Sequence, residues 1–187
     1  MSTFAAKQFR GQTYTFEHLQ PRRLDAELSP TPGELVIVPV TVQFGCHCFT
    51  EAFDKMTHSD EHRYVHLNEL RAFDEERFQC SLKLPDIIDS MLGGKVYWST
   101  ESYTYVAQIT LPTQEGALDY SLFFALTRNS DAVRPALNMF VKSAYLKGLA
   151  APPNAESWRF RALIGLKSGV FEKKKKPKPR PKANKKK

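Results

Sequence analysis

Hydrophobic and polar residues alternate most regularly between residues 95 and 145. Residues 103–111 place five side chains on one face of an extended chain, because strand side chains point to alternate faces: Tyr103, Tyr105, Ala107, Ile109 and Leu111. Further apolar runs cover residues 95–98, 119–127 and 136–145, separated by short turns rich in Gly, Pro or polar residues. Strands joined by short turns pair antiparallel, so the pattern predicts a β-meander over 95–145.

A helical pattern precedes this meander. In residues 84–93, Pro85 suits the first helical position and Gly93 suits the C-terminal cap. The apolar residues between them recur at helical spacing: Ile87, Ile88, Met91 and Leu92. A lone meander cannot bury its apolar face, so we expect this helix to cover it. Asp74 is a plausible N-cap for a helical turn that begins at residue 75.

The remaining pattern predicts shorter elements. Residues 13–16 and 158–164 alternate as strands, and residues 29–33 and 53–68 are expected to be loops, the second with one helical turn. Residues 35–44 are rich in β-branched residues, but Pro39 cannot donate to a ladder, which predicts an edge strand or a bulge. The expected fold class is α+β, with an antiparallel sheet of four to five strands and helices on one face.

Length and composition predict one globular domain. The 187 residues are 42% hydrophobic, enough for a sizeable core. We expect an N-terminal extension over 1–34, a globular α+β domain over 35–171 and a disordered tail over 172–187. No run approaches the ~18 apolar residues of a membrane span, and the N-terminus lacks a secretory pattern. Three cysteines give no disulfide framework, which favours the cytoplasm.

Charge is concentrated at the C-terminus. Of the 27 Lys and Arg, ten fall after residue 172, where there is no acid, which leaves 17 basic and 20 acidic residues in the body. Such an extended basic chain neutralises phosphates, and this predicts nucleic-acid contacts from Lys173, Lys174, Lys175, Lys176, Lys178, Arg180, Lys182, Lys185, Lys186 and Lys187. A solubility appendage and an anionic membrane surface remain alternatives, although no amphipathic helix accompanies the tail.

The segment Cys46-His47-Cys48 is a candidate metal site, with His58, His62 and His66 downstream. His62 and His66 would share one face if their segment were helical. Structural zinc sites, however, usually separate their cysteines by two or more residues, and small cysteines are common in core strands. The spacing therefore favours no metal. The phosphate-loop, dinucleotide and common hydrolase motifs are also missing from the sequence, so no cofactor is expected.

A second polar set has the residue types for RNA cleavage without a metal: His66, Arg71, Glu76, Arg77, Ser81, Ser143 and Tyr145. Cleavage needs a base for the 2′-hydroxyl, an acid for the leaving oxygen and a cation for the phosphorane. The alternative is that Glu76 and Arg77 lie on a solvated helix face and that Tyr145 is an ordinary strand residue. The spacing does not decide between them.

Two resemblances add to this interpretation. The segments 46–51, 71–78, 84–88 and 141–145 resemble, within residues 35–165, small bacterial proteins with labels such as stationary-phase adaptation protein. The layout also resembles the barnase–EndoU–colicin–RelE group of ribonucleases. That resemblance implies catalytic roles for His66, Arg71, Arg77, Ser143 and Tyr145. The expected function is nucleic-acid binding, RNA more than DNA, with a protein partner or antitoxin as a further expectation; a metal-independent ribonuclease toxin is the alternative.

Overall fold

A computed structural model describes residues 3–99, 104–113, 116–146 and 154–172. The strands in this part of the chain are β1 (Lys7–Phe9), β2 (Gln12–Tyr14), β3 (Arg22–Leu28), β4 (Val36–His47), β5 (Thr50–Ala52), β6 (Arg63–His66), β7 (Glu69–Phe73), β8 (Lys95–Ser99), β9 (Thr104–Thr113), β10 (Gly116–Arg128), β11 (Leu137–Leu146) and β12 (Ser157–Arg159). The helices are η1 (Glu17–Leu19), η2 (Asp60–His62), α1 (Glu75–Ser81), α2 (Leu84–Ser90), η3 (Met91–Gly93) and α3 (Phe160–Ser168).

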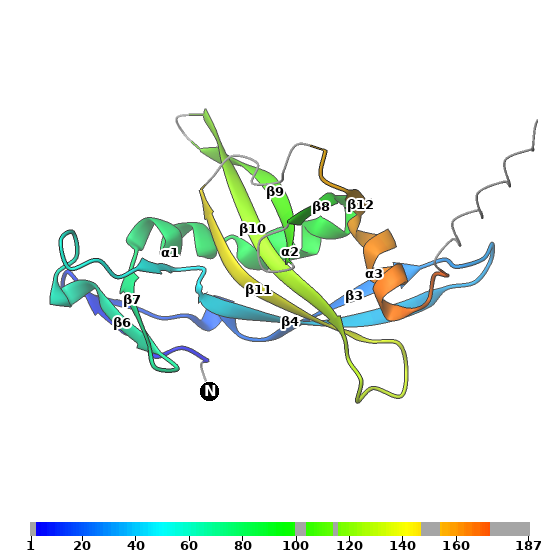
Figure 1. Cartoon of the computed structure of the whole chain (residues 1–187), viewed down its shortest axis with the longest axis horizontal. Helices are drawn as coiled ribbons and strands as arrows, with labels where there is room; N and C mark the ends of the chain where they lie inside the picture. The colour runs from blue at the N-terminus through cyan, green and yellow to red at the C-terminus, as the bar shows by residue number, and fades with distance from the viewer. Residues whose placement is uncertain (1–2, 100–103, 114–115, 147–153, 173–187) are drawn as a thin grey trace, which may run out of the picture.

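The main sheet has seven strands in the order β12-β8-β9-β10-β11-β4-β3 (Figure 1). Its centre is the predicted meander, since β8, β9, β10 and β11 pair antiparallel with their neighbours in sequence. The α+β class is therefore confirmed. The expected four to five strands were too few, because β3 and β4 extend the sheet on one side and β12 extends it on the other.

Strand β4 joins the N-terminal part of the chain to the meander. It pairs parallel with β11 and antiparallel with β3. The prediction of an edge strand is thus wrong for β4 as a whole. Pro39 is nevertheless tolerated, because pairing with β11 begins only at Val40, and at Pro39 the strand pairs with β3 alone.

The segment expected to be a loop with one helical turn, 53–68, contains the short helix η2 as expected, but it also contains the strand β6, which was not expected. β6 and β7 form a hairpin, and β5 completes a three-stranded sheet in the order β5-β7-β6. The two turn residues, Leu67 and Asn68, both have positive φ, as a tight two-residue hairpin turn requires. His62 ends the short helix η2 and His66 lies in β6, so the two histidines do not share a helix and the condition for a common helix face is not met.

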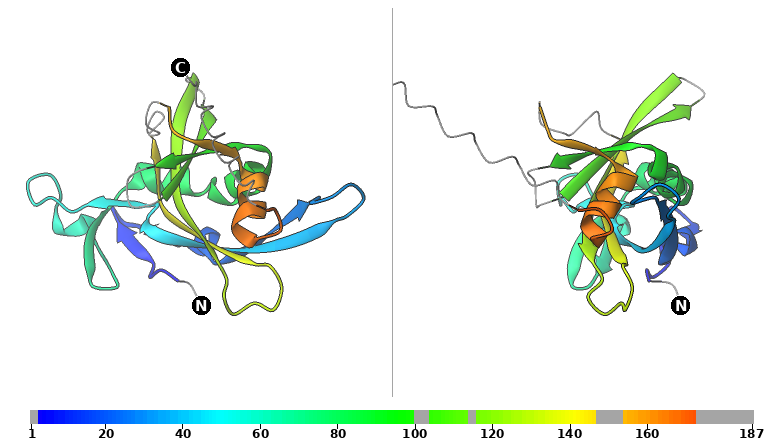
Figure 2. Two further views of the ribbon diagram at one scale, coloured as in Figure 1. Left: turned by 45° about the vertical axis from the view of Figure 1, so that its right-hand side comes forward. Right: turned by 90° about the vertical axis from the view of Figure 1, so that its right-hand side faces the viewer.

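The predicted strand over 158–164 is also wrong, since only β12 is extended and a helix follows from Phe160. The buried side chains Phe160, Leu163, Ile164 and Ser168 follow helical spacing, and Gly169 ends the helix in a left-handed conformation. A short window of alternation over 158–162 concealed that spacing. Helix α3 contacts β10, β11, β4 and β3, and lies between the meander and the β3–β4 ribbon (Figure 2).

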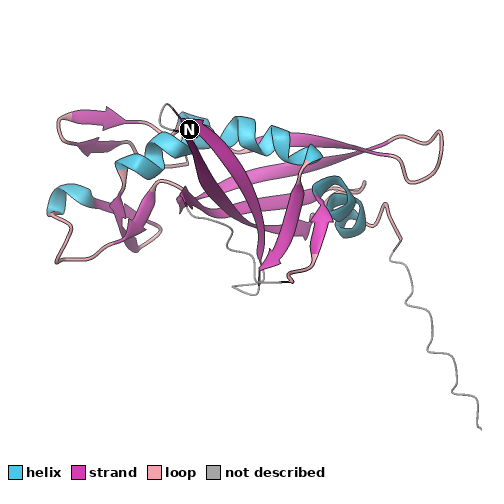
Figure 3. Ribbon diagram, turned by 90° about the horizontal axis from the view of Figure 1, so that it is seen from above, coloured by secondary structure: helices cyan, strands magenta, loops and turns pink. Residues whose placement is uncertain are grey.

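The other two helices agree with the sequence pattern. Helix α2 continues into η3 and ends at Gly93, with Pro85 in its first turn. Asp74 caps α1, since its carboxylate accepts from the Arg77 backbone N–H at 3.0 Å. Seen from above, α1 and α2 follow one another along one side of the sheet (Figure 3). Among the described helices none has the length and apolar character needed to cross a bilayer.

Residues before 35 belong to the same core as the rest. Phe16 is 1% exposed and its ring stacks on that of Phe49 at 4.0 Å, while Phe4 packs edge-on against both. The expected boundary between residues 34 and 35 falls in the turn that joins β3 to β4. The tail residues from 173 onward lie outside the described part of the chain.

We expect Phe16→Ala to lower the free energy of unfolding by about 3–5 kcal/mol, because it opens a cavity in this aromatic core. Urea denaturation would measure the change. Phe140→Ala is the matched control, since Phe140 is 42% exposed and its loss should cost less than about 1 kcal/mol. An unchanged midpoint for Phe16→Ala would show that the N-terminal residues do not stabilise the fold.

Candidate functional site

A cavity of about 620 Å³ lies where the two larger sheets meet. Its walls come from the end of β4, from β11 and from the β6–β7 turn, with Thr3, Leu19 and Pro21 closing one side. Two predicted catalytic residues, His66 and Ser143, line it. Ser143 pairs with His47 across the β4–β11 ladder, which brings a second histidine to the same wall.

His47 and Glu69 form the polar centre of this cavity. The His47 Nε2 atom lies 3.0 Å from Glu69 Oε1 and 3.2 Å from Oε2. Arg71 donates to the same carboxylate from Nη1 at 3.2 Å and to Thr50 Oγ1 from Nε. Partial burial acts to raise the pKa of Glu69, but the His47 hydrogen bond and the Arg71 charge outweigh it, so the pKa lies below its ordinary value.

The two cysteines of Cys46-His47-Cys48 differ in their surroundings. Cys46 is 4% exposed and lines the cavity; burial and the nearby Glu69 charge raise the pKa of its thiol. Cys48 is fully buried, and its Sγ lies 3.9 Å from the Val141 carbonyl oxygen. Burial raises the pKa of Cys48 further. Cys48 is thus absent from the cluster of possible metal ligands, which consists of Cys46, His47 and Glu69.

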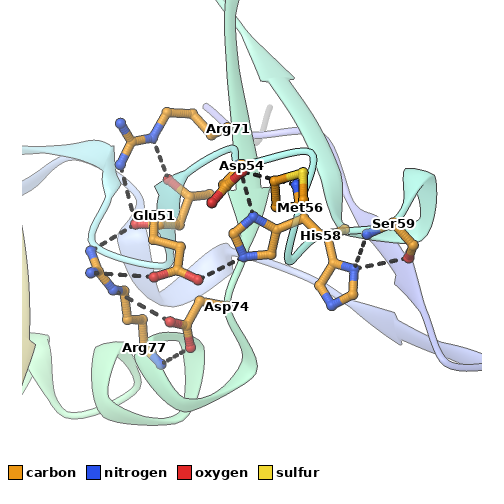
Figure 4. A network of polar contacts seen from close by, with 10 residues as sticks. Glu51, Asp54, Met56, His58, Ser59, Arg71, Asp74 and Arg77 are labelled. Carbon is orange, nitrogen blue, oxygen red and sulfur yellow. Dashed lines mark hydrogen bonds and ion pairs between the residues drawn. The ribbon is translucent and has the colours of Figure 1, made fainter.

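The other histidines considered for a metal site have separate partners. His58 Nε2 lies 2.9 Å from a Glu51 carboxylate oxygen, and its Nδ1 accepts from the Asp54 backbone N–H (Figure 4). His62 Nδ1 contacts Ser59, as the capping pattern of η2 requires. These two histidines hold the β5–β6 connection in place and do not face the cavity.

Arg77 and Tyr145 belong to a different place in the fold. Arg77 donates to the Thr50 carbonyl oxygen at 2.9 Å and lies beside Glu51 and Asp74 (Figure 4). Its guanidinium carbon also lies 4.8 Å from the centroid of the Tyr145 ring. Arg77 and Tyr145 both line a small cavity of about 200 Å³. The five predicted catalytic residues therefore line two cavities: His66 and Ser143 line the 620 Å³ cavity, and Arg77 and Tyr145 line the 200 Å³ cavity. Arg71 lies between them, since it donates to Glu69 and shares the Thr50 carbonyl oxygen with Arg77.

The remaining members of the polar set are structural or exposed. Ser81 is buried and donates to the Phe78 carbonyl oxygen at 2.7 Å. Glu76 is exposed on α1, in agreement with the solvated helix face that was its alternative interpretation. Neither faces the large cavity.

A third cavity, of about 680 Å³, is aromatic and was not predicted from the sequence. Tyr105 contacts Trp98 at 5.1 Å and Trp158 at 5.8 Å between ring centroids, both edge-on. Lys167 of α3 places its ammonium group 5.5 Å from the Tyr105 ring centroid. Glu156 also lines the cavity.

Pairing of distant strands creates this aromatic cavity. Trp98 lies opposite Tyr105 in the β8–β9 ladder, and β12 brings Trp158 opposite Val96. Trp98 and Trp158 are both half-buried, so part of each ring borders the cavity. The two tryptophans are far apart in sequence, and the only signal that could have pointed to the cavity was the tryptophans themselves.

The aromatic cavity has wall residues that are close in sequence to the basic end of the chain. Arg159, Arg161 and Lys167 are exposed on β12 and α3. Glu172, the last described residue, is followed directly by the ten basic residues of 173–187. These ten tail positions were the predicted phosphate contacts, and they lie outside the described residues.

Comparison with known proteins gives one match. The family model of the YjaZ family matches residues 6–166. The chain belongs to the YjaZ family. The match covers nearly all of the body, including His47, Glu69, Trp98 and Trp158, and excludes the tail. No curated protein and no solved structure matches the chain. The family match supports the resemblance to a bacterial protein family and extends it from residues 35–165 to 6–166, but no match carries the stationary-phase label or names a ribonuclease.

We expect Arg77→Ala to lower the free energy of unfolding by roughly 1–3 kcal/mol, because it removes the guanidinium hydrogen bond to the Thr50 carbonyl oxygen and the ion pair with Asp74. Chemical denaturation followed by circular dichroism would measure this. Arg134→Ala, in an exposed loop, is the control and should stay within about 0.5 kcal/mol of the wild type. Equal stability of the two variants would contradict a structural role for Arg77.

Proposed function

We propose that this YjaZ-family protein binds single-stranded nucleic acid, RNA in preference to DNA. The observation that supports this most is the aromatic cavity lined by Trp98, Tyr105, Trp158 and Lys167, in a chain whose sequence ends in ten basic residues. Proteins that bind single strands combine aromatic side chains, on which bases stack, with a cationic path for the backbone. Here the aromatic component is the cavity formed by Trp98, Tyr105 and Trp158, and the cationic component is Lys167 together with the ten basic residues of the tail.

The aromatic cavity has the chemistry of a base-binding site. Half-buried Trp98 and Trp158 offer apolar ring surface, and a stacked base is worth about 1–3 kcal/mol. Lys167 stands at the same cavity with a cation for a phosphate. The Glu156 carboxylate can accept from an exocyclic amine, as acidic side chains do with cytosine.

The charge distribution gives the tail the larger share of the affinity. The body carries a net charge of −3, from 17 basic and 20 acidic residues, and so does not attract a polyanion by its overall field. Ten cations on the tail neutralise phosphates and release counterions, a sequence-independent contribution that weakens with salt. Tail and cavity thus have separable roles, the tail in affinity and the cavity in preference among bases.

Shortening the chain to residues 1–172 should abolish most of the binding. It should also reduce the dependence of log K on log salt, by up to about 0.7 for each phosphate that the tail no longer neutralises. Fluorescence anisotropy with matched RNA and DNA oligonucleotides, over a series of salt concentrations, would measure both. A full-length variant with the ten basic tail residues changed to Ser separates charge from length. Unchanged affinity and salt slope would refute the role of the tail.

Trp158→Leu should weaken RNA binding about tenfold, because it keeps apolar packing but removes the stacking surface. Phe140→Leu, an exposed aromatic at the other large cavity, is the matched control and should bind normally. Quenching of tryptophan fluorescence by RNA would follow the same contact. Equal affinities for both variants would place base binding elsewhere and leave the tail alone as the RNA contact.

RNA cleavage without a metal is the alternative function, and a protein partner or antitoxin stays a prediction. Since Arg77 and Tyr145 lie away from His66 and Ser143, we expect RNA incubated with the protein in EDTA to remain intact. Denaturing gel electrophoresis would show this for the wild type, His66→Ala and Tyr145→Ala. Cleavage that survives the chelator and is abolished in His66→Ala would favour the ribonuclease alternative.

A further inference from the structure

Three metal-ligating side chains converge at the wall of the 620 Å³ cavity. The Cys46 thiol, a ring nitrogen of His47 and a Glu69 carboxylate oxygen all lie within 4.8 Å of one another. Three ligands of a tetrahedral zinc ion, with bonds of about 2.0–2.3 Å, lie roughly 3.5 Å apart. Glu69 is half exposed, so its side chain can make the small movement that closes the set.

The geometry points to a binding site for a divalent transition-metal ion, with Cys46, His47 and Glu69 as ligands. It goes beyond the proposed nucleic-acid binding and rests on different residues. The spacing of the cysteines argued against a metal in the sequence, and that argument holds for Cys48, which faces the core. Glu69 takes its place because the β6–β7 hairpin folds back toward the end of β4.

The donor set selects the class of ion. One sulfur, one imidazole nitrogen and one carboxylate oxygen suit zinc and its borderline-soft neighbours. Calcium and magnesium prefer oxygen ligands alone, and a buried thiol offers them none. Zinc is therefore the ion to test first, with cobalt as a spectroscopic substitute.

Neighbouring side chains hold the ligands in place. Arg71 donates to Glu69 and to Thr50 Oγ1, and Thr50 Oγ1 in turn donates to the Cys46 carbonyl oxygen at 2.7 Å. Such outer hydrogen bonds orient ligands in metal sites. Arg71, expected from the resemblance to contact phosphate, is in this arrangement a positioning residue that ties Glu69 to the strand of Cys46.

Three protein ligands leave one tetrahedral position for a water or a substrate atom. That position would face the cavity, because all three ligands line it together with His66 and Ser143. Sites with an open fourth position are those in which a metal acts on a bound molecule, whereas structural zinc sites have four protein ligands. An ion held by these three ligands would be accessible to molecules that enter the cavity.

Titration calorimetry of the full-length, chelator-treated protein with ZnCl2 tests the site. We expect one equivalent of zinc to bind. Removing a residue that hydrogen-bonds to a metal ligand typically lowers the affinity for the metal about 10–100-fold. Removing a ligand itself, in Cys46→Ser or Glu69→Gln, should lower the affinity for zinc at least as much. Cys80→Ser, which removes a half-buried thiol on α1, is the matched control and should bind zinc normally.

Cobalt provides a readout specific for the thiolate. Wild type and Cys80→Ser should show the absorption of a cobalt–sulfur bond, and Cys46→Ser should not. Glu69 is half exposed, so Glu69→Gln tests the site even if Cys46→Ser fails to fold. Absence of zinc binding to the wild type, or equal binding to wild type and Glu69→Gln, would overturn the proposal.

Discussion

The parallel pairing of β4 with β11 is the constraint on which the rest of the structure depends. It is the contact through which the N-terminal hairpin of the main sheet joins the meander, and it needs very close backbones near its end. A Cβ atom at Gly45 would lie 2.9 Å from the Lys142 carbonyl oxygen, so glycine is required there. The register shift between Val141 and Ser143 then sets His47 opposite Ser143. The 620 Å³ cavity lined by His47 and Ser143 depends on that register.

Local signals predicted much of the fold. The meander follows from period-two alternation and its Gly and Pro turns, and α2 from Pro85 and Gly93, because each depends on residues close in sequence. The Leu67-Asn68 hairpin was missed because only Asn68 is a usual turn residue. Helix α3 was missed because the alternation of apolar residues over 158–162 is too short to distinguish a strand from the first turn of a helix.

The candidate sites were harder to predict, because both depend on contacts between distant segments. Cys46 and His47 drew attention as adjacent metal-ligand types, but their third partner, Glu69, comes from another sheet. Trp98 and Trp158 share a cavity only because β12 pairs with β8. Composition alone identified the basic tail, since its chemistry depends on charge and needs no tertiary contact.

The two outer strands of the main sheet bear on how this protein avoids aggregation. One edge, β12, is only three residues long, and the other, β3, turns three charged side chains to solvent: Arg23, Asp25 and Glu27. Short strands and charges at sheet edges prevent another chain from adding to the ladder. Where β3 and β4 run on as a two-stranded ribbon, Pro39 interrupts the donors along the free side of β4 (Figure 1). The margins of this sheet therefore carry features that oppose edge-to-edge pairing, and no further layer has to cover them for that purpose.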